Sequence, residues 1–380
     1  MSVSVDNRRT RTRSALAAVL TVLILVPAAI LFASVWGTIS DKRDDAQREK
    51  QGVEYISALA PLVSALAEAQ SSALAGVAAA PGSLNAAVNG VAAVDQRLGD
   101  ELNTRDRWTG LNQKIDGLAK VTGNPIAVFQ AHVEVTDLAL ALYDTVRDNS
   151  ELVRDPDNDI SHLQQAVAVD LPESVVQVSR MGDLSQLVAR ADDKVRAQLT
   201  PQFGAAVEAV DSSVSELTDN LQAAVDDTTS VSLSGNLVNG LDSFRRGVES
   251  LTRGANPGGT PNAATMATAQ SQLQTSLSNL SGIVTREMTS LLDDRLDSLD
   301  NEMIVALAAA AAAVLLVAAA MMVPLTGSGR RILPAIPDEG TRDVNVGPTG
   351  PDPGRTDAGH RAPAYGEANP TRRERSGALR

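Results

Sequence analysis

Two long uncharged stretches constrain this chain more than any other feature. The first reads ALAAVLTVLILVPAAILFASVW over residues 15–36, and the second reads MIVALAAAAAAVLLVAAAMMVP over residues 303–324. As helices rising about 1.5 Å per residue, both are long enough to cross a hydrocarbon core of roughly 30 Å. We therefore predict transmembrane helices at residues 15–37 and 303–325.

Each stretch has an alternative interpretation. The first also fits a cleaved signal peptide, but it is longer than a usual h-region and no A-x-A-like site follows it. The second, rich in Ala, also fits a buried core helix, although so long a run without a polar side chain is rare in a soluble core. We favour a membrane span in both cases.

Charge around the two stretches predicts their orientation. Residues 1–14 carry four arginines, and Arg330 and Arg331 follow the second stretch. By the positive-inside rule both termini are cytoplasmic and residues 38–302 lie outside, in a two-pass protein of the plasma or inner membrane. The tails at residues 1–14 and 325–380 have net charges of +3 and +2. Because the net charge of the whole chain is −13, residues 38–302 carry a net charge of −18. Such an acidic region repels nucleic acid, and we expect no nucleic-acid partner.

The region between the spans has the pattern of an all-α fold. The chain is only 2% aromatic, and apolar residues recur every three or four positions, as at Val53, Ile56 and Leu59. We predict one or more elongated antiparallel helical bundles, flanked by two transmembrane helices that continue into the first and last bundle helices. The tail, residues 326–380, is rich in Gly, Pro and Arg and is predicted to be disordered.

Helix boundaries are predicted from Pro, Gly and capping residues. Two helices are expected at about 84–102 and 105–121, and Ala255–Asn262 is expected to be a loop. Proposed helix starts are Ser83 as an N-cap after Pro81-Gly82, Asn124-Pro125, Leu171-Pro172-Glu173 and Thr200-Pro201-Gln202.

The sequence contains no recognisable catalytic or metal-binding constellation. It has no Cys, no H-E-x-x-H pair, no glycine-rich phosphate loop and no G-x-S-x-G elbow. The three histidines, His132, His162 and His360, are expected to be surface or satisfied polar residues. We predict no enzyme activity, no catalytic residue, no cofactor and no metal.

The segment Asp155-Pro156-Asp157-Asn158-Asp159 resembles the opening of a calcium loop. That loop needs Gly at its sixth position and Glu at its twelfth, and this sequence has Ile160 and Ala166 there. We therefore assign a structural role to Asp155, Pro156, Asp157 and Asp159. They turn the chain, and Asp159 or Ser161 caps a helix beginning near Ile160.

Four polar residues late in the first helix are the candidate ligand site: Glu68, Gln70, Ser71 and Ser72. They line a pocket between helices or, on the alternative interpretation, face solvent.

Several segments resemble one family in the same order. They are Lys50–Tyr55 with Leu59–Val63, Asp148–Asp157, Ser161-His162-Leu163 with Leu171-Pro172-Glu173, and Arg286–Leu299 before a span. Together they resemble the extracytoplasmic helical sensor module of bacterial methyl-accepting chemotaxis receptors, sensor kinases and diguanylate cyclases, over about residues 40–325. The resemblance implies a ligand-sensing domain that binds a small molecule, dimerises along its first helix and signals by small helix displacements.

Two departures from that family matter. Ser71-Ser72 stands where the family has a basic pair, and residues 325–380 contain no HAMP linker, heptads or catalytic motif. We therefore expect a membrane-anchored sensor that acts through a separate membrane signalling protein. The alternative is a structural or assembly protein of the cell envelope with a helical docking domain.

Overall fold

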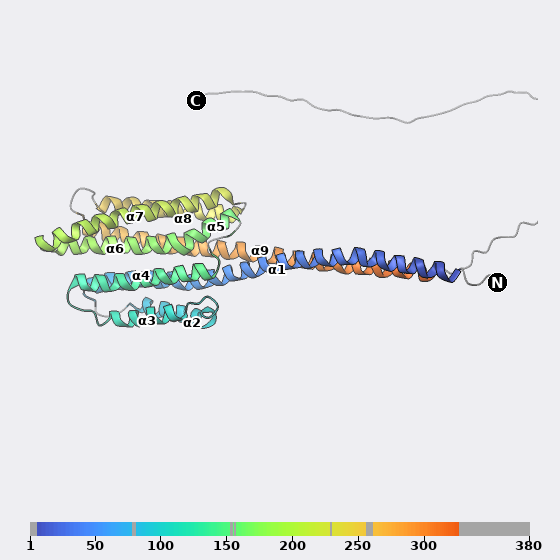
Figure 1. Cartoon of the computed structure of the whole chain (residues 1–380). Coiled ribbons are helices and arrows are strands. Elements are labelled where there is room, and N and C mark those ends of the chain that lie inside the picture. The colour runs from blue at the N-terminus through green and yellow to red at the C-terminus, as the bar shows by residue number, and fades with distance from the viewer. Residues whose placement is uncertain are drawn as a thin grey trace, which may run out of the picture. The chain divides into compact units, whose positions relative to one another are not determined.

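The computed structural model describes residues 6–77, 81–152, 155, 157–228, 230–255 and 261–326. Every regular element in these residues is a helix and no strand occurs among them (Figure 1), so the all-α prediction is confirmed. The tail at residues 327–380, for which disorder was predicted, lies outside the described residues.

Two helices are far longer than the rest. Helix α1 (Asp6–Leu74) has 69 residues and α9 (Ala263–Thr326) has 64, and each includes one uncharged stretch without a break. Within the described residues, three helices are long and apolar enough to cross a membrane: α1, α9 and α4 (Pro125–Asn149).

Outside their uncharged stretches, α1 and α9 run antiparallel. Arg43 pairs with Asp300, and Lys50 pairs with Asp293. Ser71, which follows Arg43 on α1 by 28 residues, contacts Gln270. Residue numbers that rise on one helix therefore meet numbers that fall on the other. These contacts are spread over roughly 42 Å of α1 at about 1.5 Å per residue.

Helices α2 (Gly82–Leu98), α3 (Arg105–Leu118) and α4 cover one side of α1. Helix α2 is antiparallel to α1, since Ser83 donates a hydrogen bond to Glu68 and Tyr55 donates one to Asp95. Helix α4 ends against Gly52, where an added Cβ would lie 2.1 Å from the Ser150 hydroxyl oxygen.

Helices α5 (Asn158–Gln165) and α6 (Leu171–Arg190) form one run through the π-helical turn η1 (Ala166–Asp170). Pro172 has no N–H to donate to the carbonyl four residues back, and a π turn before it is a local widening that accommodates such a loss. The predicted helix start at Leu171-Pro172-Glu173 is confirmed, since α6 begins at Leu171 with Pro172 in its first turn, although the chain enters α6 already helical from η1.

Helices α7 (Asp193–Asp227) and α8 (Val231–Ala255) complete the described residues. Helix α7 begins where the Asp192 carboxylate accepts a hydrogen bond from the Val195 amide, so Pro201 lies inside α7 and the predicted start there is wrong. Helix α8 is antiparallel to α9. Their backbones approach where Gly240, Gly247 and Gly254 face Leu280, Leu273 and Met266.

Of the remaining predicted boundaries, one is confirmed and one is wrong, and a third lies partly outside the described residues. Asn124 caps α4 through a hydrogen bond to the Ile126 amide, as predicted. Ser83 is not a cap, because α2 begins at Gly82 and the Ser83 hydroxyl bonds to Glu68 instead. Of the predicted loop Ala255–Asn262, Ala255 ends α8 and residues 261 and 262 precede α9, while residues 256–260 lie outside the described residues.

Candidate functional site

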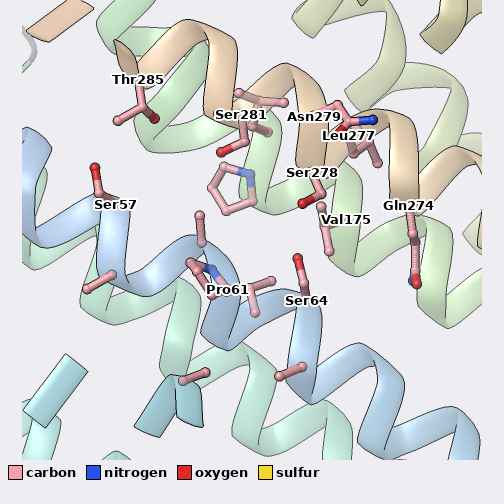
Figure 2. A pocket seen from close by; sticks show the side chains of 18 of the residues that line it. Ser57, Pro61, Ser64, Val175, Gln274, Leu277, Ser278, Asn279, Ser281 and Thr285 are labelled. Atoms are coloured by element: carbon pink, nitrogen blue, oxygen red, sulfur yellow. The ribbon is translucent and has the colours of Figure 1, made fainter. Parts of the chain in front are cut away.

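A cleft of about 1030 Å³ opens between α1 and α9, the two helices that carry the uncharged stretches. Figure 2 shows Ser57, Pro61 and Ser64 of α1 facing residues of α9 across this space. On α9 the lining residues recur every three or four positions, so they form one face of the helix: Thr275, Ser278, Ser281, Gly282 and Thr285.

The lining combines an apolar floor with hydrogen-bonding walls. The floor includes Leu277, Val175 and Tyr143, and Tyr143 is 2% exposed. Hydroxyls and amides recur along the walls between small apolar side chains, and among the described lining residues Glu68 and Arg286 have charged side chains. Such a cleft can hydrogen-bond a polar solute along its length, and it offers no exposed ring for stacking.

Just beyond the end of the cleft far from the uncharged stretches, hydrogen bonds converge on Asp183 of α6, which is fully buried. Gln70 and Ser71 each donate to its carboxylate at 2.8 Å, and Ser179 donates at 3.4 Å. Burial raises the pKa of the Asp183 carboxyl to about 6, against the lowering effect of these donors. We call this cluster the distal tie; Gln270 of α9 joins it through Ser71 at 3.5 Å.

Beyond the end of the cleft nearer the uncharged stretches, charged side chains join α1 to α9. Arg295 of α9 pairs with Asp155, with Asp157 at 3.0 Å and with Glu49 of α1 at 3.7 Å. The Asp155 side chain has no exposed surface and that of Glu49 is 5% exposed. We call Glu49, Asp155, Asp157 and Arg295 the proximal tie.

The structure separates the four candidate ligand residues. Gln70 and Ser71 belong to the distal tie, where Asp183 occupies their hydrogen-bonding groups. Glu68 is exposed, lines the cleft and accepts a 2.6 Å hydrogen bond from Ser83. Ser72 is half-buried and does not line the cleft. Only Glu68 of the four is therefore placed to meet a solute in the cleft.

The Asp155–Asp159 motif does turn the chain, since the Asp155 carboxylate accepts a hydrogen bond from the Asp157 amide at 2.7 Å. Helix α5 begins at Asn158, so Asp159 and Ser161 lie inside it and the predicted capping by either is wrong. Pro156 lies outside the described residues. The motif's larger role, holding Arg295 of α9, was not predicted, because a pairing across 140 residues has no local signal.

The two histidines that the structure describes, His132 and His162, lie away from the cleft. His132 is buried in α4, and burial lowers its pKa to about 4, so its ring is neutral near pH 7. His162 contacts Asn220 of α7 at 3.3 Å, and His360 lies outside the described residues. Within the part of the chain that the structure describes, no group of His, Asp and Glu is arranged to hold a metal.

No protein-family model, curated protein or solved structure matches this chain. The resemblance to chemoreceptor sensor modules therefore stays a prediction from the sequence.

Proposed function

We propose that this protein is a two-pass membrane sensor that binds a polar small molecule outside the cell membrane. The observation that carries the proposal is the cleft between α1 and α9. A solute bound there contacts both helices that lead to the predicted membrane spans.

The choice of α1 and α9 as the spans rests on burial. In the most apolar stretch of α1, 6% of the residues are buried, and in that of α9 none are. In the most apolar stretch of α4, 44% of the residues are buried. Exposed side chains from Val19 to Val35 and from Ile304 to Leu316 suit a lipid surface. Helix α4 instead buries Phe129, Leu142 and other residues in the core, so we keep it outside the membrane with residues 38–302.

Signalling follows from unequal binding to two packings of α1 against α9. A solute that hydrogen-bonds both helices favours the packing that best matches its length, and only this difference in affinity can move the helices. Shifts of about 1–2 Å between packed helices are the usual scale of such transitions. We propose that a separate membrane protein receives the shift.

The alternative role in envelope assembly has less support. A docking surface calls for a contiguous exposed apolar stripe. In the described part of residues 38–302, the large exposed apolar side chains are Val77 after the end of α1, Leu138 on α4 and Val238 on α8, so they are spread over separate parts of the chain.

A thermal-shift screen of the full chain in lipid nanodiscs tests ligand binding. The panel is amino acids, organic acids, polyols, polyamines and nucleosides. We expect at least one compound to raise the melting temperature, and Ser278→Leu, which fills the cleft, to abolish that rise. Ser298→Leu, at an exposed serine of the same helix outside the cleft, is the matched control. A panel without effect, or a rise that persists in Ser278→Leu, would refute the cleft as the binding site.

Labelling of single cysteines tests the topology, since the chain has no Cys of its own. Val238 is 52% exposed on α8, so Val238→Cys in intact cells should react with an impermeant maleimide. Gly350→Cys in the tail should react only after lysis. The reverse pattern would invert the protein in the membrane and remove the sensor proposal.

A further inference from the structure

In the proximal tie, one guanidinium connects three separate segments of the chain. Arg295 of α9 holds Asp155 of the α4–α5 connection and lies 3.7 Å from Glu49 of α1. One Glu49 carboxylate oxygen, Oε2, is buried without a hydrogen bond. The nearby Gly52–Ser150 approach packs the same connection onto α1, so a change at Glu49 reaches both α9 and α4.

Charge within the tie is unbalanced. The groups facing Glu49 are Asp45 on its own helix, Asp155 from the connection and Arg295 from α9, and Asp157 binds the outer side of the guanidinium. Lys50, the nearest lysine on α1, is already paired with Asp293. If every carboxyl were ionised, two buried carboxylates would share a single cation that Asp157 also uses. Like charges in one desolvated site resist simultaneous ionisation.

We propose that the proximal tie is a proton-operated latch that fixes the position of α9 against α1. With the proton on Glu49, Asp155 and Arg295 form a balanced pair and the latch is closed. Loss of that proton, to hydroxide in alkaline solution, leaves a second buried negative charge. The cluster then opens, and α9 gains freedom to move along α1.

The direction of the response follows from Glu49. Burial, and then the neighbouring Asp155, raise the pKa of the Glu49 carboxyl to about 9, against the lowering effect of Arg295. A raised pKa of an acid means that the closed state binds the proton more tightly than the open one. The proton's contribution to the closed latch is therefore complete below the ordinary carboxyl pKa of 4.5, weakens as the pH rises and is lost as the pH passes through about 9. This argument does not depend on what the cleft binds.

Spin-label distances measure the latch directly. Gln47→Cys on α1 and Ser298→Cys on α9 replace exposed uncharged residues, and the full chain in nanodiscs is labelled at both. We expect the distance distribution to shift or broaden between pH 7 and pH 9.5. With Glu49→Gln, whose amide cannot ionise, the pH 7 distribution should persist at pH 9.5. Glu54→Gln, at an exposed glutamate of the same helix paired with Arg97, should respond as the wild type does.

Two results would overturn the latch. One is a wild-type distribution that is unchanged up to pH 9.5 while circular dichroism shows a folded protein. The other is a Glu49→Gln protein that still responds to pH. Should Glu49→Gln fail to fold, Asp155→Asn supplies the second measurement, because it removes the other buried carboxylate and should likewise abolish the response.

Discussion

The distal and proximal ties both join α1 to neighbouring segments, but they do so with different chemistry. Each places a buried carboxylate between α1 and its neighbours, but Asp183 is met by an amide and hydroxyls whereas Asp155 is met by a guanidinium. Neutral donors stabilise a carboxylate without cancelling its charge, and a cation cancels it. Because burial raises the pKa of both Asp183 and Glu49, rising pH places uncompensated charge in the distal tie first and in the proximal tie later.

The largest effect should come from removing the only cation of the proximal tie. Arg295→Met leaves buried Asp155 and Glu49 without a partner, and breaking a buried pair in this way costs about 3 kcal/mol. For a domain of this size that corresponds to a fall of about 6–10 °C in the melting temperature, read by circular dichroism at pH 7. Arg295→Lys should recover part of the loss. A shift below 2 °C in Arg295→Met would mean that Asp155 is held by its other contacts.

The distal tie should respond to pH rather than to loss of a cation. The Asp183 pKa is raised, so its contribution to stability is complete below about pH 4 and is lost as the pH rises through about 6. Asp183→Asn should remove this loss, worth about 2–3 kcal/mol, so that its melting temperature exceeds that of the wild type at pH 7.5 but not at pH 4.

Asp116→Asn, at an exposed aspartate of α3, is the control for the general effect of removing one negative charge. If Asp183→Asn followed the wild-type pH profile, the hydrogen bonds from Gln70 and Ser71 would be compensating fully for burial of the charge.

These differences between the ties mark what the sequence could and could not predict. The apolar period at Val53, Ile56 and Leu59 correctly predicted a helix with one buried face, and all three residues are fully or almost fully buried. Periodicity says which face is buried, but it does not say against which partner. The pairing of Arg295 with Asp155 and that of Gln70 with Asp183 join positions more than 100 residues apart, so no local pattern indicates them.

For the same reason, the sequence indicates only one side of the cleft. Thr275, Ser278 and Thr285 recur at helical spacing opposite the leucines of α9, which is a signal in the sequence. The candidate ligand site was instead predicted within Glu68–Ser72, because its polar residues are close together in sequence. Adjacent residues on a helix point in different directions, so the structure sends Glu68 to the cleft and Gln70 to the core.

Another buried carboxylate, that of Asp95, allows an effect on stability to be measured apart from the position of α9. Asp95 of α2 accepts hydrogen bonds from Tyr55 at 2.8 Å and from Thr104 at 2.6 Å, and so ties α1 to α2 without touching α9. Tyr55→Phe should cost about 1 kcal/mol, or roughly 2 °C in melting temperature. The distance between labels on α1 and α9 should not change. A changed distance would show that α2 also sets the position of α9, and the two ties would lose their special status.

The smallest effect should come from the outermost bridge between α1 and α9. Arg43 bonds Asp300 at 2.7 Å, a better distance than that between Arg295 and Glu49, but its side chain is 41% exposed and that of Asp300 is 48% exposed. Water already solvates both groups, so Arg43→Ala should move the melting temperature by only about 1 °C. The small shift should vanish in 0.5 M salt because exposed pairs are screened. If Arg43→Ala instead matched Arg295→Met in size, burial would not be what distinguishes the proximal tie from the surface pairs beside it.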